Sequence, residues 1–398
     1  MLTRRELMKR SLLCSLTPAV PTFLARTARA AGGDPDGRVL VVVELNGGND
    51  GLNTVVPFRD EQYARLRPQI KLAPERLIKL TDELGLHPAM RSAGELFEAG
   101  RFAIVQGVGY PNPNRSHFRS MAVWQSARLD SSEQDQYGWL GRALDAGRPV
   151  APHAVYVGSE APGVALWGRS ATVAAIHSLD DLALLAPSEL LRASTALPAA
   201  TDGAAQMVAR LADEAFTSAQ RLTALAEVPV AAGSAGFGGS QLGRNLRTVA
   251  TLIESGCPSS VYYTVHSGYD THAGQTTTHS SLLGEFSTAV GALVARLAAS
   301  GLGERVLLLA YGEFGRRAAE NASAGTDHGA AAPVFLAGPQ FTESIVGPQP
   351  DLARLDRGDV PMAIDFRQVY ATVLERWLGV PAAEVLGGPF EPLPLFSA

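Results

Sequence analysis

The chain has 398 residues, of which 46% are hydrophobic and 18% are charged. This composition excludes an intrinsically disordered protein and allows one large domain or two of ordinary size. The formal net charge is −5, but residues 1–30 carry six basic side chains against Glu6, a net +5, so the remainder carries −10. A general nucleic-acid binder would need a basic excess instead, and we expect no nucleic-acid partner.

Residues 1–30 have the three parts of a removable export signal. The pair Arg4-Arg5 lies in the basic part, residues 11–24 form a short apolar stretch, and residues 28–30 (Ala-Arg-Ala) are a small-residue cleavage site. The paired arginines match the twin-arginine pattern. We therefore expect the mature chain, residues 31–398, to pass through the twin-arginine export machinery and to act in the periplasm or outside the cell.

The alternative for this leading segment is a basic amphipathic N-terminal helix. Its apolar stretch is too short to span a membrane, and no later stretch reaches about 18 uninterrupted apolar residues. We therefore expect no integral membrane segment.

The mature chain alternates between strand and helix patterns. Continuous apolar runs predict strands buried on both faces, at Arg38–Leu45, Phe102–Val108, Ser260–Val265, Arg305–Ala310 and Pro333–Ala337. Apolar residues at helical spacing predict helices at Ala205–Leu225, Gln241–Glu254, Ser281–Ser300 and Arg367–Leu378. Such alternation predicts a mostly parallel sheet covered by helices on both faces.

Two segments do not follow this alternation. Residues 226–240 are small and rich in glycine, and they predict a surface loop rather than a domain boundary, because the α/β pattern resumes directly afterwards. Residues 150–200 are ambiguous. The sequence therefore predicts a single domain over residues 31–398.

Polar side chains gather where the predicted strands end. The candidates are Asp50 after the first strand, Arg115, Ser116 and His117 after the second, Asp270 and His272 after the third, Glu313 and Arg316 after the fourth, and Asp327 and His328 before the fifth. Ligands of open α/β sheets bind at the carboxyl ends of the strands, so we expect one shared site. Carboxylate oxygens and imidazole nitrogens favour a divalent metal, zinc or manganese first and calcium as a further alternative.

Each of these residues also has a purely structural alternative. The pair Asp327-His328 could close a loop or cap a helix, or it could be a ligand with its orienting partner. Glu313 could be the ion-pair partner of Arg316 or Arg317. Their occurrence at successive strand ends favours a shared polar site over separate structural roles.

Five motifs follow one another in the chain. They are ELNGGNDGLNTVVP from Glu44, YPNPNRSHFRSM from Tyr110, GYDTHAGQ from Gly268, GEFGRR from Gly312 and GTDHGAA from Gly325. In this order they resemble the DUF1501 family, over nearly the whole mature chain. That family is placed in the alkaline phosphatase/sulfatase-like superfamily, which implies a three-layer α/β/α sandwich. The resemblance also implies hydrolysis or transfer of phosphate and sulfate esters with one or two metals and a serine- or threonine-type nucleophile.

The resemblance assigns roles to the residues at the strand ends. It implies metal ligation by Asp50, Asp270, His272, Glu313, Asp327 and His328, attack by Ser116, and stabilisation of the anion by His117 or Arg115. Three features depart from the superfamily pattern, and the first is that the Asp270-x-His272 spacing is tighter than usual. Glu313-Phe314 stands where an Asp-His pair is usual, and Cys257 is followed directly by Pro258, so the sulfatase signature C-x-P-x-R is absent.

The sequence thus predicts an exported metal-dependent hydrolase acting on a small-molecule or envelope ester of the phosphate or sulfate type. One alternative is a non-catalytic envelope binding protein on a degenerate version of the fold. Another is a hydrolase that uses activated water, with Ser116 only positioning the substrate.

Overall fold

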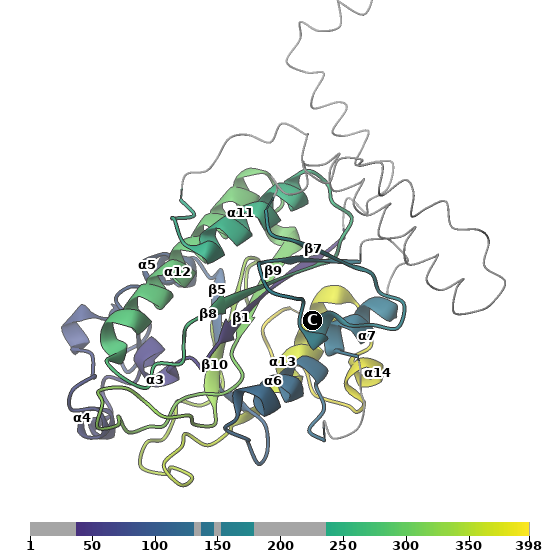
Figure 1. Cartoon of the computed structure of the whole chain (residues 1–398). Helices are drawn as coiled ribbons and strands as arrows, with labels where there is room; N and C mark the ends of the chain where they lie inside the picture. Colours follow the sequence, from purple (N-terminus) through teal and green to yellow (C-terminus); the bar gives the residue numbers. More distant parts are fainter. Residues whose placement is uncertain (1–36, 131–136, 147–152, 179–235, 398) are drawn as a thin grey trace, which may run out of the picture.

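The computed structural model describes residues 37–130, 137–146, 153–178 and 236–397 (Figure 1). The predicted export signal, the predicted helix Ala205–Leu225 and most of the predicted loop 226–240 lie outside these residues.

A nine-stranded sheet runs through the centre of the molecule. Its order is β11 (Ile345–Val346), β5 (Phe102–Gly109), β10 (Ala332–Ala337), β9 (Val306–Tyr311), β1 (Val39–Asn46), β8 (Val261–Ser267), β6 (Ala154–Val157) and β7 (Val173–Ile176), with β12 (Ile364–Asp365) also beside β5. All five predicted strands are present, with bounds shifted by at most two residues. β6 and β7 come from the segment that was ambiguous in sequence.

The sheet is parallel except for one strand. β10 runs antiparallel to both of its neighbours, β5 and β9, and all other pairs are parallel. The start of β10 therefore lies at the same edge of the sheet as the carboxyl ends of β1, β5, β8 and β9. This reversal brings the β9–β10 loop to the edge where ligands bind in such sheets.

Three helices cover one face of the sheet: α5 (Arg91–Glu98), α11 (Gln241–Glu254) and α12 (Gln275–Ala299) (Figure 1). Val41 and Val43 of β1 point to this side, where they share a core with Phe286 and Val290 of α12. Among the described helices only α12 has the length and composition of a membrane span, and half of its most apolar window is buried. Its buried side chains belong to the core of the domain, so packing accounts for its apolar character.

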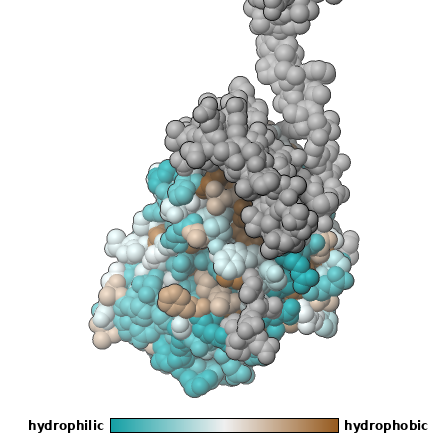
Figure 2. Space-filling model, turned by 45° about the vertical axis from the view of Figure 1, so that its right-hand side comes forward, coloured by the Kyte–Doolittle hydropathy of each residue, from teal (hydrophilic) through white to brown (hydrophobic). Residues whose placement is uncertain are grey.

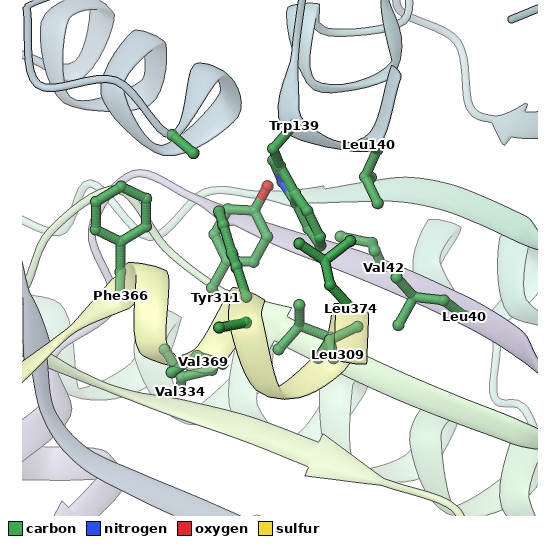
Figure 3. Packing of buried hydrophobic residues seen from close by; sticks show 14 of the residues in the cluster. Leu40, Val42, Trp139, Leu140, Leu309, Tyr311, Val334, Phe366, Val369 and Leu374 are labelled. Carbon is green, nitrogen blue, oxygen red and sulfur yellow. The ribbon is translucent and has the colours of Figure 1, made fainter. Parts of the chain in front are cut away.

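A second group of helices covers the opposite face. It consists of α6 (His117–Ser126), α7 (Trp139–Asp145), α13 (Phe366–Thr372), the π-helical η5 (Val373–Leu378) and α14 (Ala382–Leu386). Leu40 and Val42 of β1 point to this side and pack with Trp139 of α7 and Leu374 of η5 (Figure 3). Since alternate residues of one strand enter two separate cores, the predicted three-layer α/β/α sandwich is confirmed.

The remaining described elements are short. They are α3 (Gly51–Thr54), α4 (Glu61–Leu66), η2 (Pro74–Arg76), η3 (Val164–Leu166), η4 (Gly303–Arg305) and a small sheet of β2 (Val55–Val56), β3 (Ile78–Lys79) and β4 (Gly85–Leu86). On the face drawn in Figure 2, hydrophilic residues cover most of the lower part of the molecule, and exposed apolar residues lie in small separate areas.

Candidate functional site

Four loops meet at the edge of the sheet where most strands end. They follow β1, lead from β5 into α6, follow β8, and connect β9 to β10. These loops and the first residue of α6 carry every residue singled out from the sequence.

Three histidine Nε2 atoms surround one carboxylate oxygen, Oδ1 of Asp270. The distance to this oxygen is 3.0 Å from His328, 3.1 Å from His272 and 3.5 Å from His117. The Nε2 atoms of His272 and His328 are 2.9 Å apart. The candidate ligand atoms of His117, Asp270 and His328 all lie within 4.8 Å of one another. We call these four side chains the histidine–aspartate cluster.

The other ring nitrogen of each histidine faces a hydrogen-bond acceptor. Nδ1 of His117 donates to Glu313 Oε1 at 2.6 Å, and Nδ1 of His272 donates to Asp327 Oδ1 at 3.1 Å. Nδ1 of His328 donates to the carbonyl oxygen of Arg115 at 2.7 Å. An oxygen that only accepts requires the proton on Nδ1, so in the neutral ring Nε2 carries a lone pair. In neutral rings, the Nε2 atoms of His117 and His272 therefore face Asp270 with lone pairs, whereas His328 Nε2 forms a hydrogen bond with Asp270 Oδ1 at 3.0 Å. Histidines that ligate metals are oriented through Nδ1 by such outer partners.

Three of these side chains, His117, Asp270 and His328, are close enough to share one metal ion. Ligand atoms about 2.1 Å from zinc, at the corners of a tetrahedron, are about 3.4 Å apart. The Nε2 atoms of His328 and His117 lie 3.0 and 3.5 Å from Asp270 Oδ1, near this spacing, and His272 adds contacts of 3.1 Å to Asp270 and 2.9 Å to His328. His117 Nε2 is buried and has no hydrogen-bond partner among the described residues. Three imidazole nitrogens with one carboxylate oxygen suit zinc better than calcium, which takes oxygen ligands.

The protonation of the cluster follows from its contacts. The hydrogen bond with Glu313 raises the pKa of His117 above its ordinary value. Burial acts to raise the pKa of Asp270, but the hydrogen bonds from His328 and Arg316 outweigh it and lower this pKa to about 2. Asp270 is therefore an ionised carboxylate, the form that binds metal.

Arg316 fixes the loops around the cluster. Its buried guanidinium donates to Asp270 Oδ1 at 2.7 Å and to the carbonyl oxygens of Gly48 and Thr326 at 2.7 Å, Tyr269 at 2.9 Å and Gly47. Hydrogen bonds from a charged donor are about twice as strong as neutral ones. One side chain thus joins the loops after β1, β8 and β9.

Glu313 pairs with a histidine instead of an arginine. Its buried carboxylate accepts from the N–H groups of Gly47 at 3.0 Å and Gly48 at 3.2 Å, in addition to His117. Gly47 has a φ of +119°, and a Cβ there would lie 2.4 Å from the backbone nitrogen of Asp270. Glycine at this position therefore permits the contact between the loops after β1 and β8.

Asp50 is held by other partners. Its Oδ2 pairs with Arg67 NH1 at 2.6 Å and also accepts from Gln275 Nε2, and both charged side chains are buried. Burial acts to raise the pKa of Asp50, but the charge and hydrogen bond of Arg67 outweigh it, so the pKa is lowered. The predicted ligand is thus neutralised by Arg67, a residue that no sequence motif singled out.

Two arginines share one buried carboxylate beside the cluster. Arg115 NH2 pairs with Oδ2 of Asp359, and Arg317 Nε lies 3.6 Å from its Oδ1. The arginine side chains are 39% and 38% exposed, whereas the Asp359 side chain is 4% exposed. Both arginine side chains keep more than a third of their surface exposed, so their guanidiniums could contact an anion beside the cluster. Sequence reasoning missed Asp359 because it follows no strand and belongs to no motif.

Ser116 is the N-cap residue of α6 and is exposed. Serine at this position usually accepts a hydrogen bond from the first turn. Here its side chain makes no such bond, while its backbone N–H donates to Asn114 Oδ1 at 2.8 Å. The hydroxyl is therefore left available next to His117.

Several solved structures are similar to this chain in part. Ps i-CgsB matches with a TM-score of 0.43 and 10% identity, covering 90% of this chain and 75% of that chain. The sulfatase PsFucS1 from Pseudoalteromonas sp. matches with a TM-score of 0.41 and 13% identity, covering 94% and 74%. A protein in the alkaline phosphatase superfamily from Vibrio parahaemolyticus matches with a TM-score of 0.33 and 9% identity, covering 83% and 71%.

No curated protein matches the chain in sequence. The profile of DUF1501, a family described as proteins of unknown function, matches residues 38–387. Since this is most of the chain, the protein belongs to the DUF1501 family.

Proposed function

We propose that this protein is an exported hydrolase that uses a divalent metal, zinc in the first place, to act on an ester of the phosphate or sulfate type. The observation that carries the proposal is the convergence of three imidazole Nε2 atoms on Asp270 Oδ1. Imidazole nitrogens and a carboxylate oxygen are the ligands that zinc takes in proteins, and here all three nitrogens lie within 3.5 Å of that oxygen.

The residues divide into ligands and positioning residues. The metal would be held by His117, Asp270, His272 and His328, and it would supply a Lewis acid that stabilises negative charge on the transferring group. Glu313, Asp327 and the Arg115 carbonyl would fix the histidine rings. Asp50 would stabilise the fold through its ion pair with Arg67.

Ser116 would be the nucleophile. Its Oγ attacks the phosphorus or sulfur atom, a new bond to Oγ forms, the bond to the alcohol oxygen breaks, and the serine proton leaves with the alcohol. Water then cleaves the serine ester and restores the hydroxyl. The proposal is supported by the exposed Oγ, which makes no capping bond at the start of α6.

Two features would bind the anionic group of the ester. Arg115 is half-exposed beside Ser116 and shares Asp359 with Arg317. The first-turn N–H groups of α6 have no acceptor within the helix, and the helix dipole favours negative charge there. An anion at this point would lie between a guanidinium and the helix start. Residues 1–30 would direct the protein to the cell envelope, where its ester substrate would be found.

The test is turnover by the purified, zinc-loaded mature protein with p-nitrophenyl phosphate, bis(p-nitrophenyl) phosphate and p-nitrophenyl sulfate. We expect hydrolysis of at least one ester, lost in both Ser116→Ala and His272→Ala. If activity survives in Ser116→Ala but is lost in His272→Ala, the nucleophile is activated water and not the serine. Zinc binding with no turnover of any ester would favour the non-catalytic binding protein.

A further inference from the structure

One aromatic side chain stands out on the surface. Among the described residues, large hydrophobic side chains are exposed at Phe118 (92%), Trp167 (50%) and Met362 (38%). Full burial of a phenylalanine is worth about 1.5–3 kcal/mol. Phe118 gains almost none of this, and it directly follows Ser116 and His117.

The exposure of Phe118 is imposed by a well-anchored helix. Trp124 of α6 is buried and stacks on Tyr311, with ring centroids 5.2 Å apart. Ser120 Oγ is 2.6 Å from both the Tyr110 hydroxyl and the Asn114 carbonyl oxygen. These contacts fix α6 and the loop before it, so the ring is presented to solvent by the fold.

The ring lies at the end of the helix where the ester would bind. Side chains of an α-helix lean toward its N-terminus, and Phe118 lies in the first turn of α6. The neighbouring His117 ring packs on Phe314 and His328, with centroid distances of 4.9 and 4.4 Å. Phe118 has no such ring contact within the described part of the chain.

We propose that Phe118 is a substrate-binding residue that stacks on a ring in the alcohol part of the ester. This inference rests on the proposed function. An apolar face next to the reacting group binds the part of the substrate that does not react, and flat carbon faces stack well on phenylalanine. The substrate ring is either an aryl group or a sugar, because both present a flat carbon face that stacks on phenylalanine.

The test measures affinities of zinc-loaded protein for phenylphosphonate, glucose 1-phosphate and methylphosphonate by calorimetry. We expect at least one ring-bearing probe to bind about 3- to 10-fold more tightly than methylphosphonate. Phe118→Ala abolishes this difference and leaves methylphosphonate affinity unchanged. Phe118→Tyr retains it, and Trp167→Ala, which removes an exposed ring elsewhere, has no effect. The probe that loses affinity in Phe118→Ala identifies the ring as aryl or sugar.

Two other results would overturn the inference and are distinguishable. If the probes bind but Phe118→Ala binds them all as wild type does, Phe118 does not contact substrate and the proposed function stands. If none of the three probes binds to zinc-loaded wild type, the proposed function fails and the inference fails with it.

Discussion

At the scale of single residues, the histidines of the cluster differ from a surface histidine in having a fixed proton on Nδ1. His272 donates this proton to Asp327 at 3.1 Å, so its Nε2 faces Asp270 with a lone pair. His177 is also a histidine but is exposed and lies outside the cluster. The pair offers a matched comparison of the same substitution in two settings.

The first prediction concerns metal content. We expect wild type purified with zinc to retain about one equivalent, His272→Ala to lose it, and His177→Ala to keep it, because a ligand is removed only in the first variant. Elemental analysis after dialysis measures this. Equal zinc in all three proteins would show that the metal is bound elsewhere.

The second prediction concerns a positioning residue. Glu313→Gln keeps an oxygen that can accept from Gly47, Gly48 and His117, but it removes the negative charge. Loss of such an outer partner typically weakens metal affinity about 10- to 100-fold. A zinc competition titration against a chelator should show this weakening with unchanged stoichiometry. Unaltered affinity would reduce Glu313 to a loop-fixing role.

A third prediction follows from Glu44, a buried carboxyl in β1. It accepts from the Tyr263 hydroxyl and from Gln125 Nε2 at 2.9 Å, and burial raises its pKa. A carboxyl with a raised pKa binds its proton more tightly when folded, so its contribution to the free energy of unfolding falls as the pH rises from the unfolded pKa through the folded one. Glutamine keeps an acceptor oxygen and does not titrate.

We therefore compare the free energy of unfolding of Glu44→Gln with that of wild type. The difference in favour of the variant should be larger at pH 8 than at pH 5. Urea unfolding at both pH values measures the two differences. A stability difference that is the same at both would contradict a raised pKa for Glu44.

The sequence singled out most residues of the candidate site but not the contacts of each one. Strand ends are recognisable from apolar runs, so the sequence predicted Asp270 and His272 at one edge, whereas His328 reaches this edge because β10 is antiparallel. The hydrogen-bond or ion-pair partner of each side chain depends on loop geometry, and loops leave no periodic pattern in the sequence. Arg67 and Asp359 therefore gave no signal in sequence.

At the scale of elements, strand direction was the property that sequence did not supply. The five long strands were recognisable because continuous apolar runs are typical of strands buried on both faces. β6 and β7 have only four residues each, too few to separate from loop. Nothing in the pattern of β10 shows that it runs antiparallel, yet its direction brings Asp327 and His328 to the site.

The fourth prediction compares two glycines with positive φ. Gly47 (φ +119°) would place a Cβ 2.4 Å from a backbone atom, whereas Gly301 (φ +74°) has nothing within 4 Å. Gly301→Ala should cost about 1–2 kcal/mol from the left-handed backbone alone. Gly47→Ala should cost about 2–4 kcal/mol and should also weaken zinc binding, since the loops after β1 and β8 must separate. Unfolding by urea, with the zinc titration, measures both; equal costs would contradict the close approach.

At the scale of the whole molecule, charge around the site favours an anion only after metal binding. The carboxylates of Asp270, Glu313, Asp327 and Asp359 outnumber the guanidiniums of Arg115, Arg316 and Arg317 by one. A divalent cation changes this local charge from −1 to +1. Residues 31–398 together carry −10, so no general positive field compensates.

The last prediction is that anion binding depends on the metal. We expect inorganic phosphate to bind the zinc-loaded protein at least about 10-fold more tightly than the metal-free protein, because the local charge reverses sign. Calorimetry at two salt concentrations measures this, and the affinity should fall at higher salt. Arg317→Gln should weaken phosphate binding a few-fold in the zinc-loaded protein, whereas His177→Ala should not. Equal phosphate affinity with and without zinc would place anion binding on the arginines alone and would remove the metal from substrate recognition.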